Sequence, residues 1–167
     1  MQIGAGQLSN HVAGSLVPVY LIHGDEILLV DEACQLVRDQ ARAQGFDERQ
    51  VFTVDKNFDW NSVSGYSQSL SLFSEKRLLE LRLPTAKPGT VGATALQEFA
   101  SQADENTLLL VWSGRLDKKA QTAKWVKALE SAGAVVAVYP ISKAELPGWI
   151  DQRLRALPAG LAPGVRH

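Results

Sequence analysis

Short runs of apolar residues recur along the chain, and between them apolar residues return every three or four positions. Runs that are apolar throughout are typical of strands in a parallel sheet, because such strands are buried on both faces. Five strands are predicted in this way: Val17–Ile22, Val51–Val54, Arg77–Leu83, Thr107–Trp112 and Ala134–Val138. In the third strand leucines alternate with Glu80 and Arg82, so we expect one of its faces to be less fully buried.

The intervals between the strands carry the start and stop signals of helices. The first predicted helix is capped by Asp25 and ends at Gly45, and the second begins at Asn57 or Asp59. A third, short helix places Leu96, Phe99 and Ala100 inward. Two more helices are predicted from Asp117 to Glu130 and from Ser142 to Leu157. Ser142 and Glu145 form a capping box at the start of the last helix.

Strands that alternate with helices predict a three-layer α/β domain around a five-stranded parallel sheet. A leader, Met1 to Leu16, precedes the first strand. We expect this domain to span residues 1–140, and residues 141–167 to be the first helix and linker of a truncated second domain. The Pro- and Gly-rich stretch beyond Leu157 favours a linker into a part that this chain lacks.

Composition narrows the class of protein only a little. The 167 residues carry a formal net charge of −1, which favours neither nucleic acid nor an anionic membrane. The one cysteine, Cys34, excludes an internal disulfide and is expected to be a small buried side chain. No apolar stretch approaches the ~18 residues of a membrane span, and Met1 to Leu16 lacks the pattern of a secretory signal. We therefore expect a cytoplasmic protein.

The turn after the first strand, His23-Gly24-Asp25-Glu26, is where a phosphate-binding loop would stand. Such a loop needs several glycines, a lysine for the β- and γ-phosphates and a Ser or Thr for Mg²⁺. This turn has one glycine, no lysine and two carboxylates, which repel phosphate. The strand that ends at Leu83 also lacks a following Asp/Glu pair to hold a metal. We expect no ATP hydrolysis by this chain.

Other catalytic sets are missing from the sequence as well. His11, His23 and His167 do not have the spacing of metal ligands, and no Gly-x-Ser-x-Gly elbow appears. The carboxylate pairs Asp25-Glu26 and Asp104-Glu105 are interpreted as helix caps and solvated loop ends. The sequence thus predicts no catalytic residue, no metal and no cofactor.

One loop and helix carry a cluster of basic residues: Arg115, Lys118, Lys119, Lys124 and Lys127. Such residues can contact nucleic-acid phosphates, and Arg115, Lys118 and Lys119 are the candidates for DNA contact. A run of this kind is more often a solvated helix face, which is the favoured interpretation here.

The stretch Gln68-Ser69-Leu70-Ser71-Leu72-Phe73 joins a predicted helix to the strand that begins near Arg77. Large apolar side chains set among polar residues are a usual sign of a protein-binding site. The alternative is that Leu72 and Phe73 fold back under the connection, and the local pattern alone favours that alternative.

Five short motifs are more specific together than any one of them: Val19-Tyr20-Leu21-Ile22-His23-Gly24-Asp25-Glu26, Gly45-Phe46, Asp59-Trp60-Asn61, Gln68-Ser69-Leu70-Ser71-Leu72-Phe73 and Leu146-Pro147-Gly148-Trp149. In this combination the chain resembles the N-terminal part of the delta subunits of bacterial DNA polymerase III, the clamp-loader subunits that open the sliding clamp. The likeness extends from about Val17 to Ala156, which is most of the chain.

The resemblance implies a RecA-like AAA+ domain with a degenerate nucleotide site, in agreement with the turn at Gly24. It also implies that Leu72 and Phe73 enter the peptide pocket of the sliding clamp, the beta subunit. Gln68 and Ser71 match the polar positions of the same clamp-binding motif, and Leu70 lies between them. With a named partner, the exposed interpretation of Leu72 and Phe73 becomes the favoured one.

The resemblance further implies a role in DNA replication, in which the chain binds and opens the clamp for loading onto primed DNA. The chain would be a non-catalytic subunit of the DNA-directed DNA polymerase holoenzyme, a nucleotidyltransferase. Its other partners would be the gamma or tau and delta prime subunits, with DNA reached through the complex. Family members continue through a small helical domain and a collar domain, whereas this chain stops at His167, which puts stable assembly in doubt.

Two rival classes stay open beside this interpretation. One is a degenerate P-loop-type nucleotide-binding enzyme that uses the turn after the first strand. The other is a DNA-binding domain that uses the basic stretch from Arg115 to Lys127.

Overall fold

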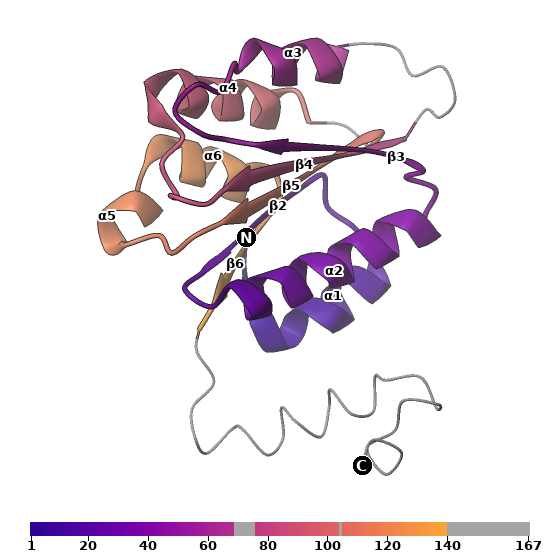
Figure 1. Ribbon diagram of the computed structural model, residues 1–167. Coiled ribbons are helices and arrows are strands. Elements are labelled where there is room, and N and C mark those ends of the chain that lie inside the picture. The colour runs from indigo at the N-terminus through magenta and orange to yellow at the C-terminus, as the bar shows by residue number, and fades with distance from the viewer. Residues whose placement is uncertain (69–75, 104, 140–167) are drawn as a thin grey trace, which may run out of the picture.

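A parallel β-sheet of six strands forms the centre of the computed structural model, which describes residues 1–68, 76–103 and 105–139 (Figure 1). Its strands are β1 (Gln2–Gly4), β2 (Val19–Gly24), β3 (Glu48–Thr53), β4 (Arg77–Leu83), β5 (Thr107–Ser113) and β6 (Ala134–Val138). They lie in the order β1-β6-β2-β5-β4-β3, so β1 and β3 form the two edges. All neighbouring pairs run parallel, as the continuous apolar runs predicted.

Helices cover both faces of the sheet (Figure 1). Helices α1 (Leu8–Gly14) and α2 (Ile27–Ala43) pack on one face. Helices α3 (Asn61–Gln68), α4 (Gly89–Ser101) and α6 (Lys124–Ala132) pack on the other. Two short helices, η1 (Ala5–Gln7) and α5 (Lys118–Gln121), complete the set among the described residues. Two apolar clusters fill the spaces between the layers, and the predicted α/β class with a parallel sheet is confirmed.

The prediction of five strands was wrong, because the stretch taken as a leader is part of the domain. Gln2–Gly4 forms the edge strand β1 on β6, and α1 buries Leu8 and Val12 completely or nearly so. A strand of three residues with an exposed edge has no apolar run to mark it. Its position is decided by the partner strand β6, which lies far away in the sequence.

The expectation that one face of β4 is less fully buried is confirmed at Arg82, whose side chain is 37% exposed while Leu79, Leu81 and Leu83 on the other face are fully buried. Glu80, on the same face as Arg82, is nevertheless fully buried. The reason is electrostatic: Arg38, Arg49 and Arg82 all donate hydrogen bonds to the carboxylate of Glu80. A paired and hydrogen-bonded carboxylate can be buried where an unpaired one cannot.

Two helix predictions need correction. The N-cap of α2 is Glu26 rather than Asp25, and no side chain caps that helix. The predicted helix from Asp117 to Glu130 is two helices, because Ala123 adopts an extended backbone between α5 and α6. The cap at Asp117 itself is confirmed, since its Oδ1 accepts a hydrogen bond from the Ala120 amide at 2.7 Å.

The stop of α2 is confirmed at Gly45, whose φ of 94° lies in the left-handed region that glycine adopts without strain. The predicted domain boundary near residue 140, the helix Ser142–Leu157 and the capping box of Ser142 and Glu145 all lie outside the described residues. In the ranges that the structure describes, no helix has the length and apolar character of a membrane span.

Candidate functional site

The residues predicted to bind a partner lie at the end of α3 and just beyond it. Gln68 is the last residue of α3. Leu70, Ser71, Leu72 and Phe73 lie outside the described residues. What the structure describes is the pair of elements that hold this stretch, namely α3 before it and β4 after it (Figure 1).

Arg77, the first residue of β4, joins the two ends of that stretch. Its Nη1 donates a hydrogen bond to the backbone carbonyl of Tyr66 at 2.6 Å. Its guanidinium carbon also lies 5.0 Å from the centre of the Tyr66 ring, in range of a cation–π interaction. Arg77 is buried, so this contact is screened little by solvent. The last turn of α3 is therefore tied directly to the start of β4.

Glu48 of β3 extends this connection to the edge of the sheet. Tyr66 donates a hydrogen bond from Oη to Glu48 Oε2 at 2.8 Å, and Arg77 Nε lies 4.0 Å from the same oxygen. Burial, together with the hydrogen bond and charge of Glu48, raises the pKa of Tyr66 to about 12. Tyr66 therefore remains a neutral donor at physiological pH, and the three side chains form one polar cluster.

Lys76 ties the same place to the end of α2. Its Nζ donates a hydrogen bond to the Gln44 carbonyl at 3.2 Å and lies 5.4 Å from the centre of the Phe46 ring. The amide of Arg77 adds a bond to the Asn106 carbonyl at 2.8 Å. The residues that follow the stretch are thus held to α2 and to the segment before β5.

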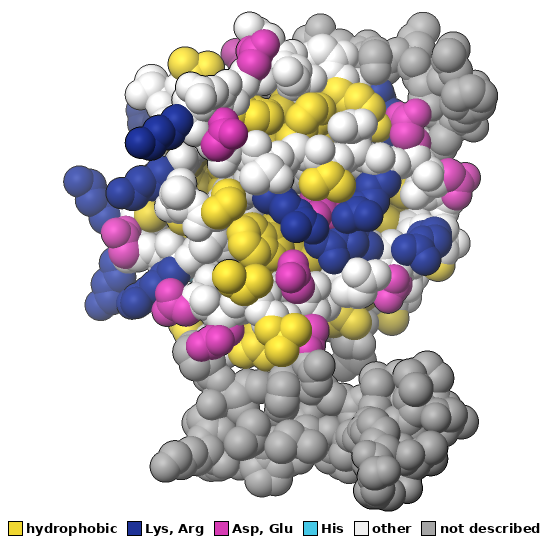
Figure 2. Space-filling view, in the orientation of Figure 1, with side chains coloured by type: hydrophobic (Ala, Val, Ile, Leu, Met, Phe, Trp, Pro, Cys, Tyr) yellow, Lys and Arg dark blue, Asp and Glu magenta, His cyan; other side chains and the backbone are white. Residues whose placement is uncertain are grey.

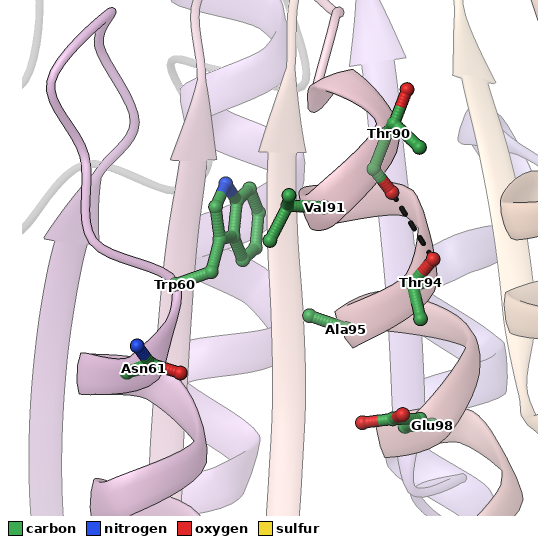
Figure 3. Close-up of a pocket in the computed structure, with 7 residues that line it drawn as sticks. All are labelled: Trp60, Asn61, Thr90, Val91, Thr94, Ala95 and Glu98. Atoms are coloured by element: carbon green, nitrogen blue, oxygen red, sulfur yellow. Dashed lines mark hydrogen bonds between the residues drawn. The ribbon is translucent and has the colours of Figure 1, made fainter.

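A pocket of about 320 Å³ lies between the start of α3 and the exposed side of α4 (Figure 3). It is lined by Trp60, Asn61, Thr90, Val91, Thr94, Ala95 and Glu98. Trp60 packs closely on α4, since a Cβ at Gly92 would lie 2.5 Å from its ring. Glu98 is the one ionisable group in the lining, so the pocket has no acid–base pair for catalysis.

The last residue of β2, Gly24, lies close against the neighbouring strand β6. A Cβ at Gly24 would lie 2.4 Å from the Val138 carbonyl oxygen, so this glycine permits the close approach of β2 and β6. The next residue, Asp25, pairs with Arg115 at 3.6 Å, and both side chains are exposed. His23 is buried, and burial lowers its pKa. In the parts of the chain that are described, no group of His, Cys, Asp and Glu could hold a metal ion.

The predicted basic residues gather on one flank of the domain. Arg115, Lys118 and Lys119 are all exposed, and Figure 2 shows dark-blue side chains on the left, where Figure 1 places α5. Lys127 differs, because its Nζ lies 3.7 Å from the Glu130 carboxylate. The structure therefore brings the three candidate DNA contacts onto one surface and pairs one of them, Arg115, with Asp25.

Sequence analysis missed the cluster of three arginines around Glu80 of β4. Arg38 of α2, Arg49 of β3 and Arg82 of β4 come from separate elements. The signal for it was a carboxylate among the leucines of β4 with Arg82 two positions further on, on the same face of the strand. The contributions of Arg38 and Arg49 cannot be read from local spacing.

Comparison with known proteins places the chain in a family. The family described as "DNA polymerase III, delta subunit" matches residues 20–138. The chain belongs to this family. The resemblance drawn from the five motifs is thereby confirmed. This delta subunit family match spans every strand of the sheet except β1 and part of β2.

Relatives of the delta subunit family agree over most of this chain. DNA polymerase III subunit delta of Escherichia coli (strain K12) is 32% identical over 151 residues, which cover 90% of this chain and 44% of that protein. Its counterpart in Haemophilus influenzae is 30% identical over 154 residues, again with 90% and 44% coverage. The chain thus spans less than half the length of these relatives.

Solved structures share the fold. The Bacillus subtilis DNA clamp loader delta protein superimposes with a TM-score of 0.67 at 16% identity, over 90% of this chain and 47% of that one. A DNA polymerase III gamma subunit-related protein of Thermotoga maritima gives 0.54 at 11% identity, over 91% and 50% of the two chains. At such identities the likeness concerns the fold alone.

Proposed function

We propose that this chain is the clamp-binding part of a clamp-loader delta subunit, and that it contacts the sliding clamp through Gln68, Leu70, Ser71, Leu72 and Phe73. Leu72 and Phe73 enter an apolar pocket of the clamp, and Gln68 and Ser71 make polar contacts at its rim. Membership of the delta subunit family supports this role. Binding that favours the open ring over the closed one would shift the clamp toward opening.

The single observation that carries the proposal is the bond between Arg77 and the Tyr66 carbonyl. It joins the last turn of α3 to the start of β4, the two elements on either side of the connection that contains Leu72 and Phe73. A recognition segment with anchored ends loses less conformational freedom on binding than a free one, so more of its contact energy appears as affinity. This anchoring supports a binding role better than a passive connection would.

We also propose that the fold is a RecA-like AAA+ domain that does not hydrolyse ATP. In an open parallel sheet, ligands bind at the carboxyl ends of the strands where the strand order reverses, which here is between β2 and β5. The residues at that point are Asp25 and Arg115, which pair with each other, and Gly24 lies close against the Val138 carbonyl. No lysine follows Gly24 to hold phosphates. The chain would then act as a non-catalytic subunit of the polymerase holoenzyme.

Titration of the chain against the cognate sliding clamp tests the clamp contact. We expect saturable binding that the Leu72→Ala/Phe73→Ala variant loses. An Ile27→Ala/Leu28→Ala variant is the control, because it removes two large apolar side chains that are exposed at the start of α2. Absence of clamp binding by the unaltered chain, under conditions where it is folded, would overturn the proposal.

Nucleotide binding is tested by thermal unfolding with ATP and Mg²⁺, since a ligand of the folded state raises its stability by mass action. We expect ATP to raise Tm no more than inorganic tripolyphosphate does at the same concentration. A larger, saturable rise with ATP would show recognition of the nucleoside and favour the rival enzyme.

DNA contact through Arg115, Lys118 and Lys119 is a second candidate function. The exposure of all three residues on one flank favours it. Binding of a labelled oligonucleotide should weaken in a Lys118→Gln/Lys119→Gln variant, and the slope of log affinity against log salt should fall by about one for each lysine removed. An unchanged slope would leave α5 as a solvated helix face.

A further inference from the structure

The carboxylate of Glu80 lies at the centre of a cluster that is buried on its inner side and exposed on its outer side. Glu80 and Arg38 have side chains that are 0% and 10% exposed, whereas those of Arg49 and Arg82 are 46% and 37% exposed. Figure 2 shows the outer side as a dark-blue patch near the middle of the face, well separated from the basic flank at α5.

Arg38 makes the most buried contact with the carboxylate of Glu80. Its Nε donates to Glu80 Oε1 at 2.7 Å and its Nη2 to Oε2 at 3.1 Å, the two-point geometry that is strongest between these groups. Its third nitrogen, Nη1, donates to Gln35 Oε1 at 3.0 Å. All three nitrogens of Arg38 are therefore engaged, and Arg49 and Arg82 each add one further hydrogen bond to the carboxylate.

Arg49 and Arg82 are each anchored by one nitrogen and leave the others available. Arg49 Nη2 donates to Glu80 Oε1 at 3.0 Å, and Arg82 Nε donates to Oε2 at 2.9 Å. Their remaining nitrogens have no hydrogen-bond partner in the described ranges. Because both groups hold oxygens of the same carboxylate, they lie side by side with free donors on the solvent side. This is a pre-formed pair of cationic groups.

The charge of the cluster favours an anionic ligand. Three guanidinium groups face Glu80, and the charge of Asp31 on α2 also acts on Arg38. Of the two other acids of α2, Glu32 has an interaction of its own and Asp39 accepts a hydrogen bond from the Gln35 amide at 2.7 Å. The three arginines outnumber the carboxylates of Glu80 and Asp31, so the cluster keeps a net positive charge, and its exposed members are Arg49 and Arg82.

The surroundings favour phosphate over a protein partner. Protein interfaces centre on large apolar or aromatic anchors. On β3 and β4 the one large apolar side chain that is exposed is Val51, at 37%. Contacts to backbone phosphates need no such anchor, and arginine is the residue best suited to make them.

We propose that Arg49 and Arg82, held in place by Glu80, form a contact site for the backbone phosphates of a nucleic-acid strand. The site lies on β3 and β4, next to α2, and is distinct from both the clamp-binding stretch and the basic flank at α5. We expect binding at this site to be independent of base sequence, because guanidinium–phosphate contacts carry no sequence information.

The test is fluorescence anisotropy of a labelled single-stranded oligonucleotide with the full chain. An Arg49→Gln/Arg82→Gln variant should bind about tenfold more weakly, with a salt slope lower by about one for each arginine. A Lys56→Gln/Lys87→Gln variant, which loses the same charge at two exposed positions elsewhere, should keep its affinity within about twofold. Equal weakening of both variants would overturn the site.

A second measurement needs no substitution, which matters if the arginine variant loses its fold. In NMR spectra of the unaltered chain, inorganic phosphate should shift the Nε–H signals of Arg49 and Arg82 more than that of Arg42 at the end of α2. No selective shift would overturn the proposal. So would a glutamate-rich peptide that shifts the two signals more strongly than the oligonucleotide, because the partner would then be an acidic protein segment.

Discussion

Arg77 and Tyr66 are joined twice, by a 2.6 Å hydrogen bond from Nη1 to the Tyr66 carbonyl and by a guanidinium that lies 5.0 Å from the centre of the Tyr66 ring. These two residues flank the stretch in which the clamp-binding residues are proposed. Glu48 of β3 bonds to Tyr66 and lies near Arg77, so the flanking pair is fixed to the edge strand of the sheet. A local change at this pair should therefore affect both folding and recognition.

Replacement of Arg77 by Met keeps most of the side chain but removes its donors and charge. We expect a loss of about 1.5–3 kcal/mol in the free energy of unfolding, as for hydrogen bonds to charged groups. Clamp affinity should fall by up to about tenfold, because freed side chains must be ordered again at about 0.5–1.5 kcal/mol each. Urea unfolding and clamp titration measure the two effects. A Lys87→Met control at an exposed position should change neither, and equal effects in the control would refute the anchoring.

The Leu72→Ala/Phe73→Ala variant separates a binding role from a core role. Burial of each side chain in a partner contributes about 1.5–3 kcal/mol, so the double change should weaken clamp binding by about a hundredfold or more. The denaturant midpoint should stay unchanged. If the two residues belong to the core instead, stability falls by about 2–5 kcal/mol per site and the midpoint drops, which would place the binding site elsewhere.

Gly24 and Gly65 give a matched pair of Gly→Ala substitutions. At Gly24 the added Cβ meets the Val138 carbonyl at 2.4 Å, so β2 and β6 must move apart at a cost of about 1–3 kcal/mol. At Gly65, inside α3, the Cβ meets nothing within 4 Å, and we expect a gain of about 0.5–1 kcal/mol. Thermal unfolding of both variants checks the signs. A neutral Gly24→Ala would mean that the turn after β2 is open enough for a ligand.

Glu80 makes stability depend on pH. Burial alone would raise the pKa of Glu80, but the hydrogen bonds and charges of Arg38, Arg82 and Arg49 lower it below the ordinary 4.5. For a lowered carboxyl pKa, the stabilisation is complete above about 4.5 and is lost as the pH falls through the lower, folded-state pKa. The free energy of unfolding should therefore decline in that acid range.

A Glu80→Gln variant provides the comparison for this decline. We expect it to be about 3–5 kcal/mol less stable near neutral pH, because it leaves Arg38 without a counter-charge in a buried position. Its stability should then vary less with pH in the acid range than that of the unaltered chain. Parallel curves for the two proteins in urea unfolding at several pH values would show that other carboxylates cause the decline.

Local pattern was enough for the main elements of the fold. The strand predicted at Arg77–Leu83 matches β4, and Ala134–Val138 matches β6, at both ends. Such strands can be recognised in the sequence because a strand buried on both faces must be apolar at nearly every position. Gly45 and Asp117 were equally readable, since a left-handed turn and a helix cap depend on one residue and its immediate neighbours. The family could also be recognised from short motifs.

Tertiary structure alone decided the rest. Glu80 is buried because Arg38 and Arg49 reach it from 42 and 31 positions away, distances over which periodicity carries no signal. The edge strand β1 exists because β6 offers it a partner, and a glycine is needed at position 24 because the Val138 carbonyl passes beside it. Buried charges and close backbone approaches depend on which distant segments the sheet brings together. The sequence by itself determined most of the strands and helices and the family. The strand order decided which distant residues lie beside β1, Glu80 and Gly24.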